Sequence, residues 1–194
     1  MYNDDRIEDE VTRATAPFAR GAQLENTLFY MGSLMSVLVS SKESGGRLCL
    51  LEYRSQPGHE PPPHIHLEQE ELLYILEGEV EVYAPGQKSY VGAGQCLFIP
   101  RGQAHAWYVL TDELRMLILT QPGGLDSYFE TMGTPATSLE LPSAATTYAM
   151  DDPSRAIRIG AEFGMTILTP EETKELLPHY PGFGNKPTPR RVQS

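Results

Sequence analysis

Two histidines one residue apart, His64 and His66, constrain this chain more than any other feature. In an extended strand, the side chains of residues i and i+2 point to the same face, so both imidazoles can converge on one point. Glu71 follows after four intervening residues, at the start of the apolar run LLYIL, which is typical of a buried strand. Neutral imidazole suits Zn, Cu, Fe and Ni, and a carboxylate completes a mixed nitrogen and oxygen ligand set. The stretch therefore predicts a metal site that keeps positions open for catalysis.

A second stretch, residues 94–109, supplies a further candidate ligand. Its apolar segment leads to Pro100 and Gly102, which bracket a predicted turn. His105 comes directly after this turn and begins another strand-like run, HAWYVL. Most of the sequence between the two stretches is a hairpin signal centred on Pro85 and Gly86. We therefore expect His105 to complete the ligand set.

Together the two stretches resemble the two sequence motifs of the cupin family. The first motif is Gly, five residues, His-x-His, three or four residues, Glu, six residues and Gly, and residues 58–78 match it throughout. The second is Gly, five residues, Pro-x-Gly, two residues, His, three residues and Asn, and the sequence departs from it only at Val109, which replaces the Asn. That Asn is not a metal ligand in the family. The resemblance implies one divalent transition metal per chain (Fe, Mn, Ni, Co, Cu or Zn), held by His64, His66, Glu71 and His105.

Glu70 is an alternative carboxylate ligand because it is adjacent to Glu71. Neighbouring residues of a strand point to opposite faces, so only one of the two can point inward. The six-residue spacing to Gly78 favours Glu71. We expect His59, in a loop rich in Pro and Gly, to lie at the rim or surface, and His179, near the end of the chain, to be solvated.

The remaining sequence predicts an all-β fold with short helices at its C-terminal end. From residue 27 to residue 121, short strand-like runs alternate with turn signals, including a predicted turn at 41–46, which favours a sandwich or barrel. Beyond Pro122 the hydrophobic period changes from two to about 3.6, and helices are expected over 125–132, 153–163 and 170–177. By the resemblance, the fold is the cupin double-stranded β-helix, a jelly-roll barrel.

These patterns divide the chain into four parts. We expect an N-terminal arm (1–26), a β-barrel (27–122), a helical C-terminal extension packed on the barrel (123–183) and a disordered tail (184–194). Exposed barrel edges tend to pair with other strands, so the segment 27–41 is the predicted contact of a homodimer.

Charge and cysteine content narrow the classes of partner. The formal net charge of −11 disfavours nucleic acid and anionic membranes as partners. The sequence shows neither a secretory signal nor an apolar run long enough to cross a membrane. Cys49 and Cys96 lie in apolar strand-like runs, so both are predicted to be buried free thiols of a cytoplasmic protein.

A cavity beside the metal should be lined by side chains that share the inward face of its strands. Leu73 and Ile75 have the same parity as Glu71 and are predicted to wall it. Trp107, the only tryptophan, lies two residues after His105, and it either stacks on a flat aromatic substrate or fills the core. Phe98 and Tyr53 are further candidates, although no ligand fixes the parity of their strands.

After the barrel strands come GLDSYFETMGTPA, a predicted helix that begins with Asp-Pro and ends in EFGM, and then TPEE. This order resembles the C-terminal part of small single-domain cupins grouped with quercetin dioxygenases, and the function is inferred from that resemblance. It implies metal-dependent dioxygenation of a small apolar or phenolic, flavonol- or polyketide-like substrate, with O₂ as a co-substrate. Glu71 would then act both as metal ligand and as the catalytic base. Two alternatives stay open, because one fold hosts many reactions. One is a non-oxidative cyclase, isomerase or dehydratase of an enolisable substrate, and the other is a non-catalytic cupin that binds a small molecule.

Overall fold

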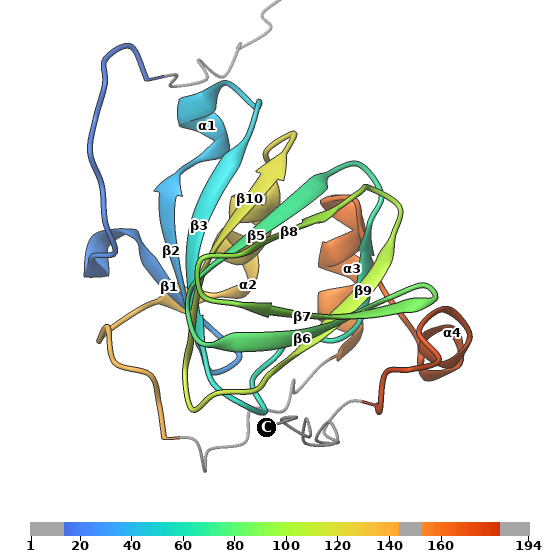
Figure 1. Ribbon diagram of the computed structural model, residues 1–194. Helices are drawn as coiled ribbons and strands as arrows, with labels where there is room; N and C mark the ends of the chain where they lie inside the picture. The colour runs from blue at the N-terminus through green and yellow to red at the C-terminus, as the bar shows by residue number, and fades with distance from the viewer. Residues whose placement is uncertain (1–13, 144–152, 183–194) are drawn as a thin grey trace, which may run out of the picture.

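The computed structural model describes residues 14–143 and 153–182 (Figure 1). Within these ranges the strands form two antiparallel sheets, which confirms the prediction of an all-β fold. The predicted tail at 184–194 and the start of the N-terminal arm lie outside the described residues. In Figure 1 the larger sheet stands upright, and β6, β7 and β9 of the smaller sheet cross in front of it.

The larger sheet contains seven strands, which come from both halves of the described chain. In spatial order they are β11 (Thr134–Pro135), β1 (Thr27–Tyr30), β2 (Ser33–Val39), β3 (Cys49–Ser55), β10 (Leu114–Gln121), β5 (Glu70–Glu77) and β8 (Cys96–Ile99).

The smaller sheet contains five strands and carries most of the histidines. In spatial order they are β12 (Met165–Ile167), β4 (His64–His66), β9 (Ala104–Val109), β6 (Glu79–Ala84) and β7 (Gln87–Gly92). Strands β6 and β7 form the hairpin predicted around Pro85 and Gly86, with Ala84 paired to Gln87.

Short helices precede, interrupt and follow the barrel strands. They are η1 (Leu24–Asn26), α1 (Ser41–Ser44), α2 (Leu125–Met132), α3 (Pro153–Glu162) and α4 (Pro170–Leu176). The three C-terminal helices begin where the sequence predicts them, and a capping box of Thr169 and Glu172 opens α4. The expected turn at 41–46 is wrong in part, because Ser40 accepts the Glu43 backbone N–H and caps a single helical turn. No helix of the described residues is long and apolar enough to span a membrane.

The hydrophobic core fills the space between the two sheets. Strand β10 shows how it is built, because every second residue from Leu114 to Thr120 is buried. Its Met116 and Ile118 meet core residues such as Val80 of the smaller sheet in one continuous cluster. Full burial of side chains of this size stabilises the fold by roughly 1.5–3 kcal/mol each.

The same alternation corrects one prediction about the cysteines. Cys49 is buried, as expected, whereas Cys96 is exposed. Cys96 is paired with Tyr74 across β5 and β8, and Tyr74 is itself exposed on the outer face of the sheet. The apolar run that contains Cys96 is therefore buried on one face only.

Gly78, the last residue of the first motif, has a backbone reason to be glycine. Its φ angle of +90° lies in the region that other residues rarely adopt. A Cβ atom at this position would also lie 2.5 Å from the Glu113 carbonyl oxygen and 2.6 Å from Thr111 Oγ1. This glycine thus permits the tight approach of the β5–β6 connection to the start of β10.

Candidate metal centre

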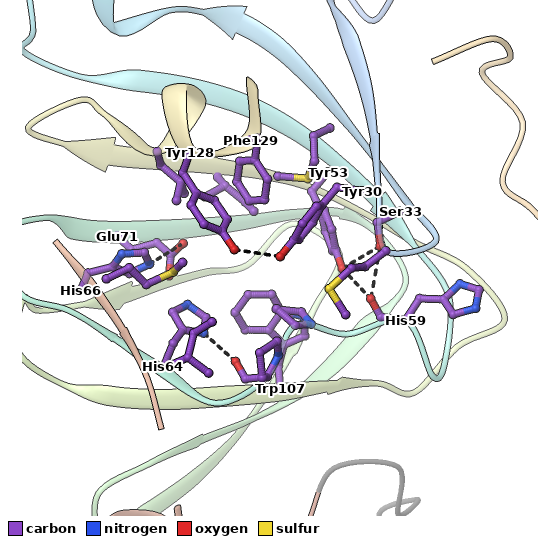
Figure 2. Close-up of a pocket in the computed structure, with 18 residues that line it drawn as sticks. Tyr30, Ser33, Tyr53, His59, His64, His66, Glu71, Trp107, Tyr128 and Phe129 are labelled. Carbon is purple, nitrogen blue, oxygen red and sulfur yellow. Dashed lines mark hydrogen bonds and ion pairs between the residues drawn. The ribbon is translucent and has the colours of Figure 1, made fainter. Parts of the chain in front are cut away.

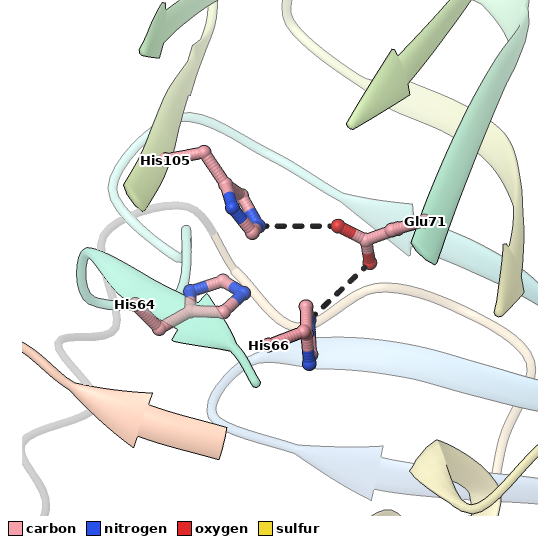
Figure 3. A group of neighbouring side chains, drawn as sticks. All are labelled: His64, His66, Glu71 and His105. Carbon is pink, nitrogen blue, oxygen red and sulfur yellow. Dashed lines mark ion pairs between the residues drawn. The ribbon is translucent and has the colours of Figure 1, made fainter. Parts of the chain in front are cut away.

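Strands of both sheets bring the predicted ligands to one place in the barrel interior (Figure 3). His64 and His66 are the two buried residues of β4, on either side of the half-buried Ile65. His105 of β9 lies directly opposite His64 in the antiparallel register, and Glu71 reaches the group from β5 in the other sheet. Their ligand atoms all lie within 4.8 Å of one another.

The choice between the two adjacent glutamates follows from strand parity. Glu71 is 2% exposed and points into the barrel, whereas Glu70 is exposed on the outer face. The structure thus places Glu71 in the cluster and leaves Glu70 in solvent, as the spacing to Gly78 predicts.

Two of the imidazoles are oriented by backbone carbonyl groups. Nδ1 of His64 lies 2.8 Å from the Pro62 carbonyl oxygen, and Nδ1 of His105 lies 3.0 Å from that of Gln103. A carbonyl oxygen can only accept, so each Nδ1 carries a hydrogen and donates it. In the neutral rings the lone pair then lies on Nε2, the atom that faces the cluster.

The centre of the cluster contains buried polar atoms that lack hydrogen bonds. His105 Nε2 lies 3.1 Å from Glu71 Oε2, and His66 Nε2 lies 3.8 Å from Glu71 Oε1. Within the described part of the chain, His66 Nε2, His105 Nε2 and Glu71 Oε2 make no hydrogen bond of acceptable geometry. Lone pairs that face each other at such distances repel, and leaving buried polar groups unpaired costs about 1–3 kcal/mol each. A cation between them removes both penalties, so the donor set fits a divalent metal with three nitrogen ligands and one oxygen ligand.

The protonation states also suit a metal. Burial lowers the pKa of both His64 and His66, and at His66 this effect outweighs the opposing attraction of the Glu71 carboxylate. Burial alone would raise the pKa of Glu71, but contact with His105 and the charges of the other histidines lower it to about 2. Neutral imidazoles and an ionised carboxylate are the forms that bind metal ions.

A mostly apolar cavity adjoins the cluster, with His64, His66 and Glu71 in its wall (Figure 2). Its volume is about 50 Å³, taken as the space open to the centre of a water-sized sphere. Apolar side chains supply most of the remaining wall, among them Met35, Ile118, Leu125, Phe129, Met165 and Ile167.

The predicted cavity residues divide into two groups. Tyr53 and Trp107 line the cavity, and Trp107 also belongs to the hydrophobic core, as one of its two interpretations predicts. Its stacking on a substrate stays a prediction. Leu73 and Ile75 point inward as predicted, but they pack within the core and do not line the cavity. The prediction of Phe98 is wrong, because it pairs with Leu72 on the outer face of the sheet and is 54% exposed.

Other cavity residues escape prediction from the sequence. His59, expected at the rim or surface, is 5% exposed and lines the cavity, and its carbonyl oxygen accepts a hydrogen bond from the Tyr53 hydroxyl. Tyr30 and Tyr128 line the cavity from β1 and α2. The only sequence signal for Tyr128 was the helical spacing of the apolar residues around it, which predicts a packed helix face and no particular partner.

Comparison with known proteins identifies the domain. Residues 51–121 match the cupin domain family. The chain is 21% identical over 126 residues to quercetin 2,3-dioxygenase of Bacillus subtilis (strain 168), which covers 65% of this chain and 37% of that protein. It is 38% identical over 56 residues to an uncharacterized protein of Aquifex aeolicus (strain VF5), which covers 29% of this chain and 46% of that protein. The chain thus spans less than half the length of either relative.

Solved structures overlap with part of the chain. KdgF from a Halomonas species is 19% identical with a TM-score of 0.48, and the overlap covers 56% of this chain and 94% of that chain. A Streptomyces PAC13 variant solved with uridine is 14% identical with a TM-score of 0.44, over 55% and 84% of the two chains. The family match and the two facing antiparallel sheets together define the fold as a cupin double-stranded β-helix. Residues 51–121 are therefore a cupin domain, and the chain resembles quercetinase-like proteins of the cupin superfamily.

Proposed function

We propose that this protein is a metal-dependent dioxygenase of a small phenolic or enolisable substrate that binds in the cavity. The observation that carries the proposal is the buried cluster of three histidines and Glu71 in the wall of an apolar cavity. Metal and substrate oxygen could therefore meet at one point, shielded from bulk water. The similarity to quercetin 2,3-dioxygenase favours oxidative chemistry over the alternatives.

His64, His66, Glu71 and His105 would hold the metal in this proposal. When bound, such a metal supplies Lewis-acid stabilisation of a substrate oxygen and the redox chemistry that O₂ requires. The protein contributes two imidazoles whose orientation is fixed by backbone carbonyl groups, and a water-poor apolar wall. One transition metal per chain is the expected stoichiometry.

Glu71 is the proposed base because it belongs both to the cluster and to the cavity wall. Its pKa of about 2 keeps the carboxylate ionised at neutral pH. An ionised carboxylate accepts the proton of an acidic hydroxyl group, such as that of a phenol or an enol, more readily than that of an alcohol. This agrees with the substrate class that the resemblance implies.

Elemental analysis followed by oxygen uptake tests the proposal. We expect near-stoichiometric Fe, Mn, Ni, Co or Cu in protein purified without chelator, and oxygen consumption with enolisable or phenolic substrates. Turnover without oxygen consumption would instead support a non-oxidative cyclase, isomerase or dehydratase. Metal-loaded protein that binds such compounds but converts none of them would support a non-catalytic binding cupin.

A homodimeric assembly in the cytoplasm is a second part of the proposal. The segment predicted to pair with a second copy forms the β1–β2 hairpin, and β11 pairs with only Leu28 and Phe29 of β1. An edge so briefly covered can accept another strand. Both cysteines are free thiols, which suits a reducing compartment. Light scattering coupled to size-exclusion chromatography measures the assembly, and a monomeric mass would rule out the dimer.

A further inference from the structure

Two tyrosines from distant parts of the chain, Tyr30 and Tyr128, meet on one side of the cavity, which we call its roof. The Tyr30 hydroxyl of β1 and the Tyr128 hydroxyl of α2 are 2.8 Å apart, and both residues line the cavity. Figure 2 shows the two hydroxyl groups at the cavity ends of their rings, with Glu71 on one side of the pair and Tyr53 on the other. Edge-to-face packing of Tyr30 on Phe129 at 5.3 Å helps to hold this arrangement.

The pair has one hydrogen more than its own hydrogen bond uses. Two hydroxyl groups carry two hydrogens, and a single hydrogen bond between them consumes one. Neither hydroxyl makes another hydrogen bond within the described residues. Burial raises the pKa of both Tyr30 and Tyr128, so both stay protonated at neutral pH. The roof therefore offers one unused O–H donor to a ligand.

The opposite wall offers a second unused donor. Trp107 is 3% exposed, and among the residues that the structure describes its Nε1 has no hydrogen-bond partner. The indole lies between the metal cluster and Tyr53, with ring centroids 6.0 Å from His64 and 6.4 Å from Tyr53 (Figure 2). An indole N–H can only donate. A ligand that accepts hydrogen bonds from both donors must carry acceptor oxygens, and the rest of it must be apolar to match the cavity wall.

The volume of the cavity limits the size of that ligand. A water molecule needs roughly 10–15 Å³ of such space, so the cavity of about 50 Å³ accommodates only a few waters. Sites for drug-sized ligands occupy roughly 300–1,000 Å³. The cavity thus matches a compact ligand better than a flavonol of three rings.

We propose that the cavity selects compact, single-ring oxygen compounds, and that the Tyr30–Tyr128 hydroxyl pair donates a hydrogen bond to their acceptor oxygen. This inference rests on the proposed metal function, because one substrate oxygen must reach the cluster in the same wall. Tyr30 and Tyr128 are then specificity-determining residues, supplied from outside the strands that carry the metal ligands. The inference narrows the substrate class to small hydroxyketones, enols and phenols.

A matched pair of probes tests the proposal on zinc-loaded protein, in which no redox turnover competes with binding. 3-Hydroxypyran-4-one and 3-hydroxyflavone share the same hydroxyketone head group and differ in size. Binding is followed through the fluorescence of Trp107, the only tryptophan of the chain, and zinc content is measured in parallel. We expect saturable binding of the pyranone, at least about tenfold tighter than that of the flavone, since a misfit of even about 1.4 kcal/mol gives that factor.

Conservative variants test the tyrosine pair. Tyr128→Phe and Tyr30→Phe should each weaken pyranone binding by about three- to tenfold, the usual worth of one hydrogen bond, with zinc content unchanged. Tyr74→Phe makes the same chemical change on the exposed face of β5 and should have no effect. The two tyrosine variants act as checks on each other if one of them folds poorly.

The outcomes separate the two proposals. If wild-type protein binds no zinc, the proposed metal function fails and this inference fails with it. If zinc binds but neither probe does, or the flavone binds as tightly as the pyranone, only the size selection and its ligand class are overturned. Unchanged pyranone affinity in both tyrosine variants would remove the hydroxyl pair from recognition and leave the metal function intact.

Discussion

The two walls of the cavity differ in where they lie in the sequence and in what they contribute. The barrel wall carries His64, His66 and Glu71, all within residues 51–121, the segment that matches the cupin domain family. The roof carries Tyr30 and Tyr128, which come from segments before and after that match. One wall is charged and suited to a metal, and the other is aromatic with a single spare donor.

This difference separates the chemistry of the site from its selectivity. The ligand cluster is built on hydrogen-bonded strands, which hold side chains with little freedom. The roof residues lie at the end of β1 and on the helix α2, outside the three strands that carry the ligands. We infer that changes in the barrel wall abolish function, whereas changes in the roof alter which ligand is accepted.

The largest effect is expected for Glu71→Gln in the barrel wall. The amide keeps the shape of the side chain but removes the proposed base and an anionic ligand, so activity should fall by about 10²–10⁴-fold while the fold persists. Steady-state oxygen uptake and circular dichroism measure the two properties. Unchanged activity would show that Glu71 is neither an essential ligand nor the base.

His66→Ala should release most of the bound metal. Loss of an outer partner of a metal ligand already costs about 10–100-fold in affinity, and loss of a ligand should cost at least as much. Elemental analysis per chain measures this, with His179→Ala as the matched control on an exposed histidine. Full metal content in the His66 variant would contradict the assigned cluster.

In the roof, Leu125→Ala should lower stability and leave metal content unchanged. Leu125 of α2 is 5% exposed, and truncation of such a side chain costs about 2–5 kcal/mol. For a chain of this size, each kcal/mol lowers Tm by roughly 2–4 °C. Leu73→Ala is the matched change beneath the barrel wall, and a loss of metal in the Leu125 variant would mean that the two walls are coupled.

The smallest effect is expected at a salt bridge remote from the metal ligands. Arg20 pairs with Glu43 at 2.7 Å and, with Ser40, holds the Glu43 pKa at about 2 instead of its ordinary 4.5. Because the folded pKa is the lower one, this stabilisation is present above about pH 4.5 and disappears as the pH falls toward 2. Arg20→Ala should cost less than about 1 kcal/mol at neutral pH. Denaturant unfolding at pH 7 and pH 3 should show the difference shrinking at the lower pH.

The barrel wall could be predicted from the sequence because its geometry is local. Strand parity explains why His64 and His66 share a face and why Glu71 points inward while Glu70 points outward. The inclusion of His105 in the ligand set required more than parity, and the resemblance of the second stretch to the cupin motif supplied it.

The roof could not be predicted, because its contacts are distant in sequence. Tyr30 and Tyr128 are 98 residues apart, and no periodic pattern relates a strand end to a helix face. Phe98 shows the same limit on a smaller scale. Its hydrophobicity indicated a buried side chain, but the edge position of β8 leaves its outer face in solvent. Leu73 points inward as its parity predicts, but it packs within the core and does not line the cavity.

The carbonyl contacts of His64 and His105 have a consequence for how such a site can evolve. Each ring is held by a backbone oxygen two positions earlier in its own chain segment, which every residue type possesses. No side chain has to be retained to keep these two rings in place. The orientation of His64 and His105 therefore does not depend on any other side chain. A new metal preference or a new reaction can arise through changes at Glu71, His66 and the roof without altering these two ligands.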